Sequence, residues 1–338
     1  MGPLRLLLAG FGNVGQRFVE LLADRAAYPG LGGLDVVIVA LTTGSHGAWS
    51  DPSGLAPAAI LEQYRAHGGF PGALDTLEAV RTLEYDVLLE LSPLNIAGRG
   101  EPAITRVRTA LDRGRHVVSA NKGPVAWAWR ELDALARTRG ARFLHEATVM
   151  DGAPVFNLAR NCLRGNTVLR LDGVLNSTTN VVLGAMEQGL DLAAAVARAQ
   201  AMGIAEADPR ADLEGWDAAV KLTALANVLM AAGLTPEAVA RQGIEHLTPQ
   251  EVTSALGRGQ RIKMVCEAFR DGGTVRASVS VRHLDLDHPF ARVEGASSVL
   301  RLHTDLFGRL ILAEDEPGLS ATAYGLIADL FALLPDIG

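Results

Sequence analysis

The chain has 338 residues, of which 49% are hydrophobic and 20% charged, and its formal net charge is -7. This length allows two domains, and the lack of a long basic run disfavours a nucleic-acid partner. No apolar run reaches the ~18 residues that a membrane span needs, and no signal peptide precedes the first strand-like run, so we expect a soluble cytoplasmic protein without membrane contact. Cys162 and Cys266 lack metal-type neighbours and are expected to be buried, reduced thiols.

The first predicted element is a strand at Leu4–Ala9, which leads directly into a glycine turn and then a helical pattern. In this context the glycines of a GxGxxG turn let a dinucleotide pyrophosphate approach the helix N-terminus. A tight glycine turn without a ligand is the alternative. We therefore expect the cofactor to contact Gly10, Gly12, Asn13, Val14 and Gly15.

The second predicted strand, Val36–Leu41, ends in Thr42-Thr-Gly-Ser-His46, without the acid that usually binds the ribose of NAD. Hydroxyls and a histidine could accept a 2'-phosphate, but no arginine is adjacent. The tip therefore favours NADP only slightly over NAD, with Thr42 as a contact. Residues 47–72 are expected to form a surface excursion with one short helix.

Strand-like runs recur at Val87–Leu91, His116–Ser119 and Arg142–Glu146, with helical patterns near 101–113 and 125–139. This alternation predicts a parallel sheet wound with crossover helices, whose ligands lie beyond the carboxyl ends of the strands. Ser92 and Lys122 follow two such ends. Lys122 could contact the cofactor or a substrate carboxylate, or it could be an ordinary exposed lysine.

The pattern changes after Asp151-Gly152, where a second α/β region begins. A strand near 168–175 ends in Asn176-Ser-Thr-Thr-Asn180, whose polar side chains could cap the next helix or bind a polar substrate, and capping alone is the more economical explanation. Helices are predicted near 154–163, 180–188, 191–202, 214–231, 236–241, 249–256 and 320–334. Strands are predicted near 261–269, 275–281, 299–303 and 310–313.

The stretch from Gly203 to Lys221 is unusually rich in charge, with five carboxylates, an arginine and a lysine. Asp217 precedes Lys221 by one helical turn, so the two side chains can pair beside an apolar stripe. Acids at a helix start and solvated ion pairs are an ordinary alternative. A divalent-metal site is a third, although the spacing of Asp208, Asp212 and Glu214 is not diagnostic.

Taken together, these motifs resemble the homoserine dehydrogenase family. The resemblance covers nearly the whole chain and is carried by GFGNVG from Gly10, SANKGP from Ser119, HEATVMDGAP from His145, GVLNSTTN from Gly173, GIAEADPRADLEGWDAAVK from Gly203 and HTDLFGRL from His303. It implies reversible NAD(P)H-dependent reduction of L-aspartate 4-semialdehyde to L-homoserine, in threonine and methionine biosynthesis. The implied fold is α/β, with a Rossmann-type dinucleotide-binding domain (1–147), an α/β substrate and dimerisation domain (148–317) and a C-terminal helix, about 318–338, packing back on the first domain.

The resemblance also implies roles for individual residues. Lys221 matches the proton donor to the carbonyl oxygen, Asp217 the acid that orients it or holds the substrate amine, and Lys122 a lysine between cofactor and substrate. Hydride attack on an aldehyde leaves an alkoxide, which needs such a proton donor and a positive field. The further implied contacts are Gly203, Glu206, Asp212 and Thr178 for the substrate, and Ser92 and Gly318 for the cofactor.

The resemblance further implies a homodimer and a sodium ion. The sodium site would involve Glu146, Val149, Asp151 and Ala153, in a loop that is usually glycine-rich in the family and here reads Val149-Met-Asp-Gly-Ala153. A C-terminal regulatory domain is not expected, and Asp315-Glu-Pro-Gly318 replaces the usual glycine turn before the last helix. Two alternatives remain: a dehydrogenase of another small amino-acid aldehyde or hydroxy acid, and a non-catalytic nucleotide sensor, which would have no reason to keep both lysines with Glu206 and Asp217.

Overall fold

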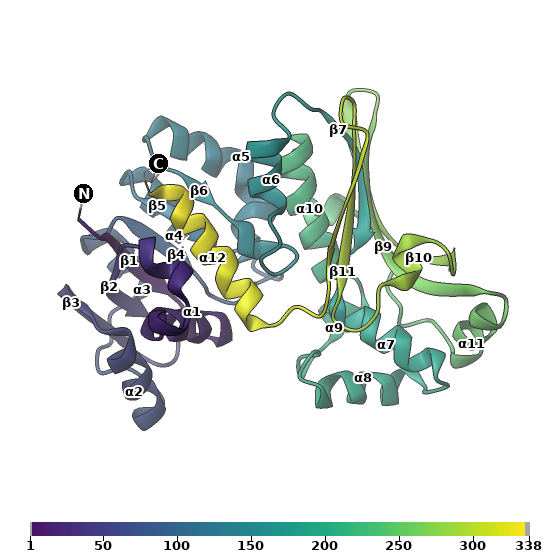
Figure 1. The fold of residues 1–338 in the computed structure, drawn as a ribbon, viewed down its shortest axis with the longest axis horizontal. Helices are drawn as coiled ribbons and strands as arrows, with labels where there is room; N and C mark the ends of the chain where they lie inside the picture. The colour runs from purple at the N-terminus through teal and green to yellow at the C-terminus, as the bar shows by residue number, and fades with distance from the viewer. Residues whose placement is uncertain (1, 335–338) are drawn as a thin grey trace. The chain divides into compact units, whose positions relative to one another are not determined.

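The computed structural model describes residues 2–334, which form two compact units (Figure 1). The first unit comprises residues 2–154 and 318–334, and the second is Val155–Pro317. The predicted extension of the final helix over residues 335–338 lies outside the described residues. No helix in residues 2–334 combines the length and apolar character needed to cross a membrane.

The first unit is built on a six-stranded sheet with the order β3-β2-β1-β4-β5-β6. Its parallel strands are β1 (Leu4–Ala9), β2 (Val36–Thr42), β4 (Val87–Glu90), β5 (His116–Ser119) and β6 (Phe143–Leu144). The helices are α1 (Asn13–Ala23), α2 (Pro57–His67), α3 (Thr76–Thr82), α4 (Ala103–Asp112), α5 (Lys122–Thr138) and α12 (Leu319–Leu333). The predicted parallel sheet with crossover helices is confirmed.

The edge strand β3 (Ala48–Leu55) differs from the sequence prediction, which gives residues 47–72 as a surface excursion with one short helix. It runs antiparallel to β2 and contains Asp51, Pro52 and Gly54, which are unfavourable in strand interiors. An edge strand tolerates them because one of its sides needs no partner. The prediction for this segment was therefore wrong about the strand, whereas α2 is the short helix that it contains.

The helix α12 is held to the first unit by apolar and polar contacts. It packs against α1, and Ala323, Leu326, Ile327 and Leu330 belong to the same buried cluster as β1. The buried Asp329 carboxylate accepts the backbone N–H of Glu146 at 2.8 Å. These contacts join the chain's last described helix to the segment that follows β6.

The second unit also contains a six-stranded sheet, with the order β12-β11-β7-β9-β10-β8. The strands are β7 (Val168–Val174), β8 (Ala240–Arg241), β9 (Gln260–Asp271), β10 (Thr274–Asp285), β11 (Ser298–Thr304) and β12 (Arg309–Glu314). The helices are α6 (Val155–Cys162), α7 (Ser177–Glu187), α8 (Leu192–Ala201), α9 (Arg210–Leu213), α10 (Trp216–Met230) and α11 (Pro249–Gly257). All neighbouring strands are antiparallel except β8 and β10.

Two local predictions for the second unit were wrong. Residues 236–241 form a 3-10 turn (Pro236–Ala238) and the short strand β8, not a helix, because so short a segment gains little from helix formation and pairs instead with β10. Cys162 is exposed, since it is the last residue of α6, whereas Cys266 is buried as expected.

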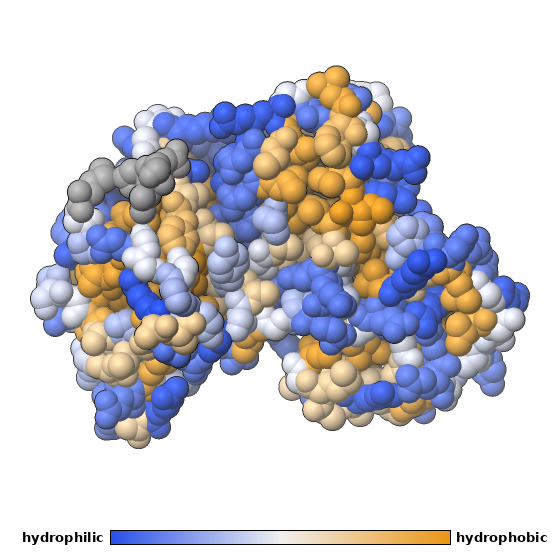
Figure 2. Space-filling view, viewed as in Figure 1, coloured by the Kyte–Doolittle hydropathy of each residue, from blue (hydrophilic) through white to orange (hydrophobic). Residues whose placement is uncertain are grey.

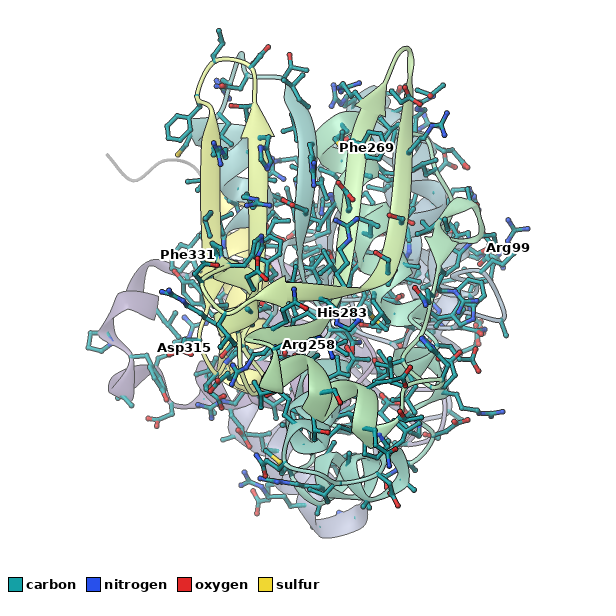
Figure 3. All side chains as sticks on the ribbon, turned by 90° about the vertical axis from the view of Figure 1, so that its right-hand side faces the viewer. Arg99, Arg258, Phe269, His283, Asp315 and Phe331 are labelled. Atoms are coloured by element: carbon teal, nitrogen blue, oxygen red, sulfur yellow. The ribbon has the colours of Figure 1, made fainter. Side chains whose placement is uncertain are left out.

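The two faces of this sheet differ in character. On one face β9 contacts α10, and the Cys266 thiol lies 3.8 Å from the Ala218 carbonyl. The other face carries a network of ion pairs, with Phe269 partly exposed on β9 (Figure 3). This network joins Asp172 and Glu267 to Arg170, Arg282 and Arg301. Apolar surface also gathers over the β7 and β11 end of the unit (Figure 2).

Candidate functional site

The glycine turn after β1 is shaped for close approach of the backbone. Gly10 has φ +115°, and a Cβ there would lie 2.7 Å from the carbonyl carbon of Leu91. Gly15 packs under the turn, where a Cβ would lie 3.3 Å from the Gly10 carbonyl oxygen. Gly12 is exposed, caps α1 without a side-chain hydrogen bond, and a Cβ there would meet no atom within 4 Å. The turn thus presents open space and backbone N–H groups at the start of α1, where Asn13 is exposed and Val14 half-buried.

A polar network lies where β4 and β5 end. The buried Glu90 carboxylate accepts the Ser92 hydroxyl and an N–H of Arg106, whose Nη1 lies 3.3 Å from Glu90 Oε2. The Asn121 amide donates to the Ser92 hydroxyl at 3.2 Å. Lys122 follows Asn121 as the first residue of α5. Ser92 and Lys122 therefore lie at adjacent strand ends, as predicted from the sheet topology.

The end of β2 differs from the sequence expectation in one detail. Thr42 is fully buried, and its carbonyl accepts the Gly10 N–H at 2.8 Å, so it supports the glycine turn through its backbone. A cavity of about 580 Å³ lies beyond it, lined by Thr43, Ser45, Asp75 and Arg106 among others. Asp75 and Arg106 were missed, because they come from the starts of α3 and α4 and not from the β2 tip.

The predicted cofactor contact Gly318 and the loop of the predicted sodium site both lie near α12. Gly318 is the exposed N-cap residue of that helix, and a Cβ there would meet no atom within 4 Å. Glu146 and Val149 are almost fully buried, and the Asp151 carboxylate accepts the Thr322 hydroxyl at 2.9 Å. Within residues 2–334 no group of three His, Cys, Asp or Glu side chains is arranged to hold a metal ion.

In the second unit, Asn176 joins the polar residues of the predicted substrate site. It follows β7 and caps α7, with its Oδ1 accepting the Thr179 N–H at 2.8 Å. Its Nδ2 donates to Asp212 Oδ1 at 2.6 Å and to Asp217 Oδ2 at 3.0 Å. Asn176 is therefore both a helix cap and a bridge between two carboxylates on α9 and α10.

Lys221 is fixed by two acceptors. Its Nζ donates to the carbonyl oxygen of Leu175 at 2.8 Å and lies 3.3 Å from Asp217 Oδ2. The Lys221 and Asp217 side chains are only 17% and 13% exposed, so the pair is largely withdrawn from water. This confirms the predicted pair one turn apart on α10 and disagrees with an ordinary solvated pair.

The carboxyl group of Asp212 is electrostatically strained. Burial, and next the Asp217 carboxylate, raise its pKa, while hydrogen bonds from Asn176 and Thr178 oppose the rise. The Thr178 hydroxyl also lies 3.3 Å from the Ile204 carbonyl oxygen. Two acids held together at one lysine make a site that attracts a further positive group.

The loop before α9 has a more open structure. Gly203 has φ +72°, which explains a glycine after α8, and Glu206 is exposed. Asp208 pairs with Arg210 at 2.5 Å and hence does not join Asp212 in a metal site. Asn176 and the Leu175 carbonyl were missed as site groups, because the N-cap pattern accounted for Asn176 and a backbone oxygen leaves no trace in a sequence.

Comparisons with known proteins identify the family that the sequence motifs resemble. Residues 10–146 match the family model for the homoserine dehydrogenase NAD binding domain, and residues 154–331 match the homoserine dehydrogenase model. The chain is 36% identical to an NAD(+)-dependent homoserine dehydrogenase of Pseudomonas canavaninivorans, over 98% of this chain and 96% of that one. It is 33% identical to the homoserine dehydrogenase of Methanocaldococcus jannaschii, over 96% and 97% of the two chains.

A solved structure gives the same result for the fold. A hyperthermophilic archaeal homoserine dehydrogenase in complex with NADPH superposes with a TM-score of 0.82 at 27% identity. The superposition covers 99% of this chain and 100% of that one. The similarity therefore extends over both units and is not limited to a common nucleotide-binding fold.

Proposed function

The chain belongs to the homoserine dehydrogenase family, which reversibly reduces L-aspartate 4-semialdehyde to L-homoserine with NAD(P)H, and on this premise we propose that Lys221 is its general acid. The observation that carries the proposal is the position of the Lys221 ammonium between the Leu175 carbonyl and the Asp217 carboxylate. Both acceptors favour the charged, proton-donating form of the amine. Burial of the pair keeps its field strong at the reacting oxygen.

Hydride transfer and proton transfer are assigned to different groups of the site. The nicotinamide cofactor supplies the hydride that reduces the aldehyde carbon. Lys221 stabilises the oxygen as negative charge develops and donates the proton that completes the alcohol. Asp217 orients Lys221, and in the oxidative direction the same lysine takes the proton back.

Substrate binding is assigned to the acids and hydroxyls of the second unit. Asp212, Asp217 and Glu206 would receive the substrate ammonium, while Thr178 and the Gly203 backbone would contact its polar groups. The pair of carboxylates held by Asn176 supports this, because two acids beside one lysine leave net negative charge. Lys122, at the start of α5, is proposed as a second catalytic lysine from its place after β5.

The NAD(P) cofactor is assigned to the glycine turn, including Asn13 and Val14, with further contacts at Ser92, Lys122 and Gly318. The preference for NADP over NAD remains a slight one. Thr43 and Ser45 hydroxyls line the cavity beyond β2 with the Arg106 guanidinium, which favours a 2'-phosphate, but the Asp75 carboxylate lines it too. Measuring kcat/KM with NADPH and with NADH decides this choice.

A bound sodium ion, a homodimer and a cytoplasmic location complete the proposal. Sodium takes oxygen ligands, and the buried Glu146 carboxylate with the carbonyls of Val149, Asp151 and Ala153 would supply them. The partly exposed Phe269 and Ile311 on the sheet of the second unit support a subunit interface there. The acidic net charge disfavours nucleic acid. Sodium-dependent thermal stability and solution mass test the first two points.

The central experiment compares the wild-type enzyme with Lys221→Met. We expect turnover of aspartate semialdehyde to fall by roughly 10²–10⁴-fold, while NADH binding stays near wild type. Arg164→Met, at an exposed arginine beyond α6, is the matched control. Near-native turnover in Lys221→Met would exclude this role for the lysine, and preferential turnover of another aldehyde would favour a related dehydrogenase.

A further inference from the structure

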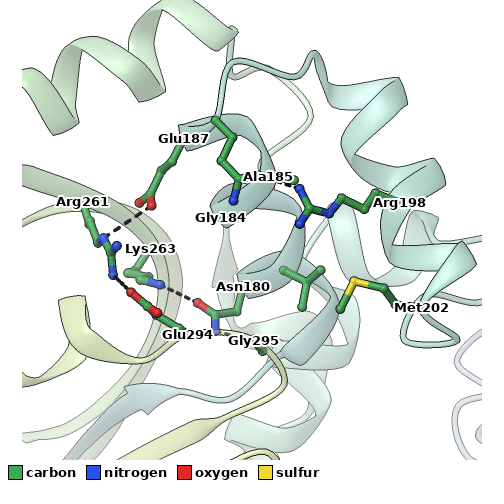
Figure 4. A pocket seen from close by; sticks show the side chains of 12 residues that line it. Asn180, Gly184, Ala185, Glu187, Arg198, Met202, Arg261, Lys263, Glu294 and Gly295 are labelled. Atoms are coloured by element: carbon green, nitrogen blue, oxygen red, sulfur yellow. Dashed lines mark hydrogen bonds and ion pairs between the residues drawn. The ribbon is translucent and has the colours of Figure 1, made fainter.

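The second unit contains a cavity that the proposed reaction does not use. It measures about 220 Å³, is open to solvent on one side, and is lined by residues of α7, α8, β9 and the loop after Val293 (Figure 4). Its floor is formed by Lys263 and Asn180, which are 3% and 2% exposed. Its rim is exposed and includes Arg198 and Met202. The cavity is therefore a small pocket with a charged floor, smaller than the pockets that hold drug-sized ligands.

Lys263 is an unusual residue in this chain. The sequence has three lysines among 31 basic residues, and the other two are Lys122 and Lys221, which are assigned to the reaction. A buried lysine is costly unless its charge is used, and arginine is the usual cation of this chain. The compact ammonium at position 263 therefore requires an explanation other than composition.

The contacts of Lys263 leave part of its donor capacity unused. Its Nζ donates to Asn180 Oδ1 at 2.6 Å and to the Val293 carbonyl at 2.5 Å. An ammonium has three N–H donors, and within residues 2–334 no third acceptor is placed for it. Asn180 is itself oriented by donating to the Gly295 carbonyl at 2.9 Å. Both acceptors are neutral, so the charge of Lys263 is not neutralised at contact distance.

The other charges around the cavity are distributed unevenly. Arg261 forms ion pairs with both acids of the cavity, Glu187 at 3.4 Å and Glu294 at 2.5 Å. Arg198 donates to the neutral Gln188 Oε1 at 2.6 Å. With three cations and two acids the cavity has an excess of one positive charge, carried by Lys263 and Arg198 (Figure 4). Val181, Ala185 and Met202 form an apolar wall beside them.

From this arrangement we propose that the cavity binds a short aliphatic monocarboxylate, whose oxygens accept from Lys263 and Arg198 and whose carbon chain packs on the apolar wall. One negative charge balances the excess of the cavity, whereas a dianion such as sulfate would exceed it. Charge-assisted hydrogen bonds of this kind are stronger than neutral ones. Lys221 does not line this cavity, but Met202 lines it and directly precedes Gly203, which begins the proposed substrate loop.

The state of Lys263 gives the site a pH signature. Burial lowers the pKa of Lys263 to about 8, with Glu187 acting in the opposite direction. Glu187 on α7, Glu294 on the loop, Arg198 on α8 and Arg261 on β9 are the charged groups that line the cavity with it. A bound carboxylate favours the charged amine, so binding should be tighter at pH 7 than at pH 9, by up to about tenfold.

The test is calorimetric titration of the enzyme with sodium butyrate at constant ionic strength, with sodium sulfate in parallel. Saturating homoserine and NADH occupy the proposed reaction site as a non-reacting pair, so that butyrate does not compete there. We expect one butyrate per chain at millimolar concentration, weakened at least about tenfold by Lys263→Met and severalfold by Arg198→Gln. Exposed Arg164, which donates to the Arg160 carbonyl at 3.0 Å, provides the control Arg164→Gln with unchanged binding.

The two variants keep the result interpretable. Lys263→Met is checked by circular dichroism, and if it does not fold, Arg198→Gln at the exposed rim carries the test. The absence of saturable butyrate binding would overturn the proposal. So would butyrate binding that Arg198→Gln leaves unchanged, or a preference for sulfate over butyrate.

Discussion

The ammonium of Lys221 lies 3.3 Å from a carboxylate oxygen of Asp217, one turn earlier on α10, and both side chains are largely buried. At an exposed position such a pair would add little. Here the Asp217 carboxylate holds the Lys221 ammonium close to Asn176, which also donates to Asp212. This geometry supports the two proposed roles, proton donation by Lys221 and orientation by Asp217.

Replacing Asp217 by asparagine tests the orienting role. The amide keeps the shape and can still accept from Asn176, but it removes the negative charge beside Lys221. We expect kcat to fall roughly 10–100-fold, less than in Lys221→Met, because the loss corresponds to one charged hydrogen bond. Steady-state kinetics with aspartate semialdehyde measures this. A kcat as low as that of Lys221→Met would instead make Asp217 as essential as the lysine.

Asn176 should reveal its two functions in a matched pair of variants. Serine is a good N-cap residue, so Asn176→Ser retains the cap of α7 but cannot bridge Asp212 and Asp217. Asn176→Ala loses both and should unfold about 1 kcal/mol more easily than the serine variant. Both should lose roughly tenfold or more in kcat/KM. Both variants are measured by steady-state kinetics and urea unfolding. A wild-type kcat/KM in Asn176→Ser would show that Asn176 serves only as the N-cap of α7.

We expect the ionised Asp212 carboxylate to lower the stability of the fold while it contributes to substrate binding. Its pKa is raised above the ordinary value of 3.8 by burial and by Asp217, so the folded state holds this proton to higher pH than the unfolded state does. Its contribution to stability is complete below about pH 3.8 and is lost as the pH rises through the raised pKa. Asp212→Asn avoids that loss, and we expect its Tm advantage over wild type to grow from pH 4 to pH 7.

The same variant should bind substrate less well, with KM raised roughly tenfold, because one acid for the ammonium is gone. Asp208→Asn is the control in the same loop. The Asp208 carboxylate is exposed, and its hydrogen bonds with Arg210 lower its pKa to about 2. The Tm of Asp208→Asn should therefore not rise relative to that of the wild type from pH 4 to pH 7. A Tm difference for Asp212→Asn that is independent of pH would contradict the assigned cause.

The sequence anticipated those features that depend on neighbours along the chain. The Leu4–Ala9 strand, the glycine turn and the Asp217–Lys221 pair each follow from spacing within one or two elements, and the structure contains all three. The Asn176 bridge could not be anticipated, because it joins residues 36 and 41 positions apart. Such a contact depends on how β7 and α10 pack, which periodicity does not encode.

The failures have similar physical causes. The edge strand β3 violates strand preferences at Pro52 and Gly54 and exists because β2 offers it a partner. The helix predicted over residues 236–241 was wrong because the pairing of β8 with β10 outweighed a short helical pattern. In both cases the missing information was the identity of a neighbouring strand, which a single sequence does not supply.

The glycine turn gives the sharpest separation of folding from cofactor binding. Gly12 has φ -78°, and a Cβ there would meet no protein atom within 4 Å, so Gly12→Ala should fold with near-native stability. Its added methyl would occupy the space that the pyrophosphate needs at the start of α1, and we expect NADH binding to weaken at least about tenfold. Gly30→Ala, at a second glycine with nothing within 4 Å, is the control for a methyl added elsewhere.

Gly10→Ala should destabilise the fold itself, in contrast to Gly12→Ala. Its φ of +115° and the 2.7 Å approach to Leu91 strain any side chain, so this variant should lose stability by roughly 1–3 kcal/mol before cofactor binding is considered. Thermal unfolding without NADH, followed by fluorescence titration with NADH, separates the two effects. Equal stability losses in Gly10→Ala and Gly12→Ala, or unchanged NADH affinity in Gly12→Ala, would show that the turn serves packing and not the dinucleotide.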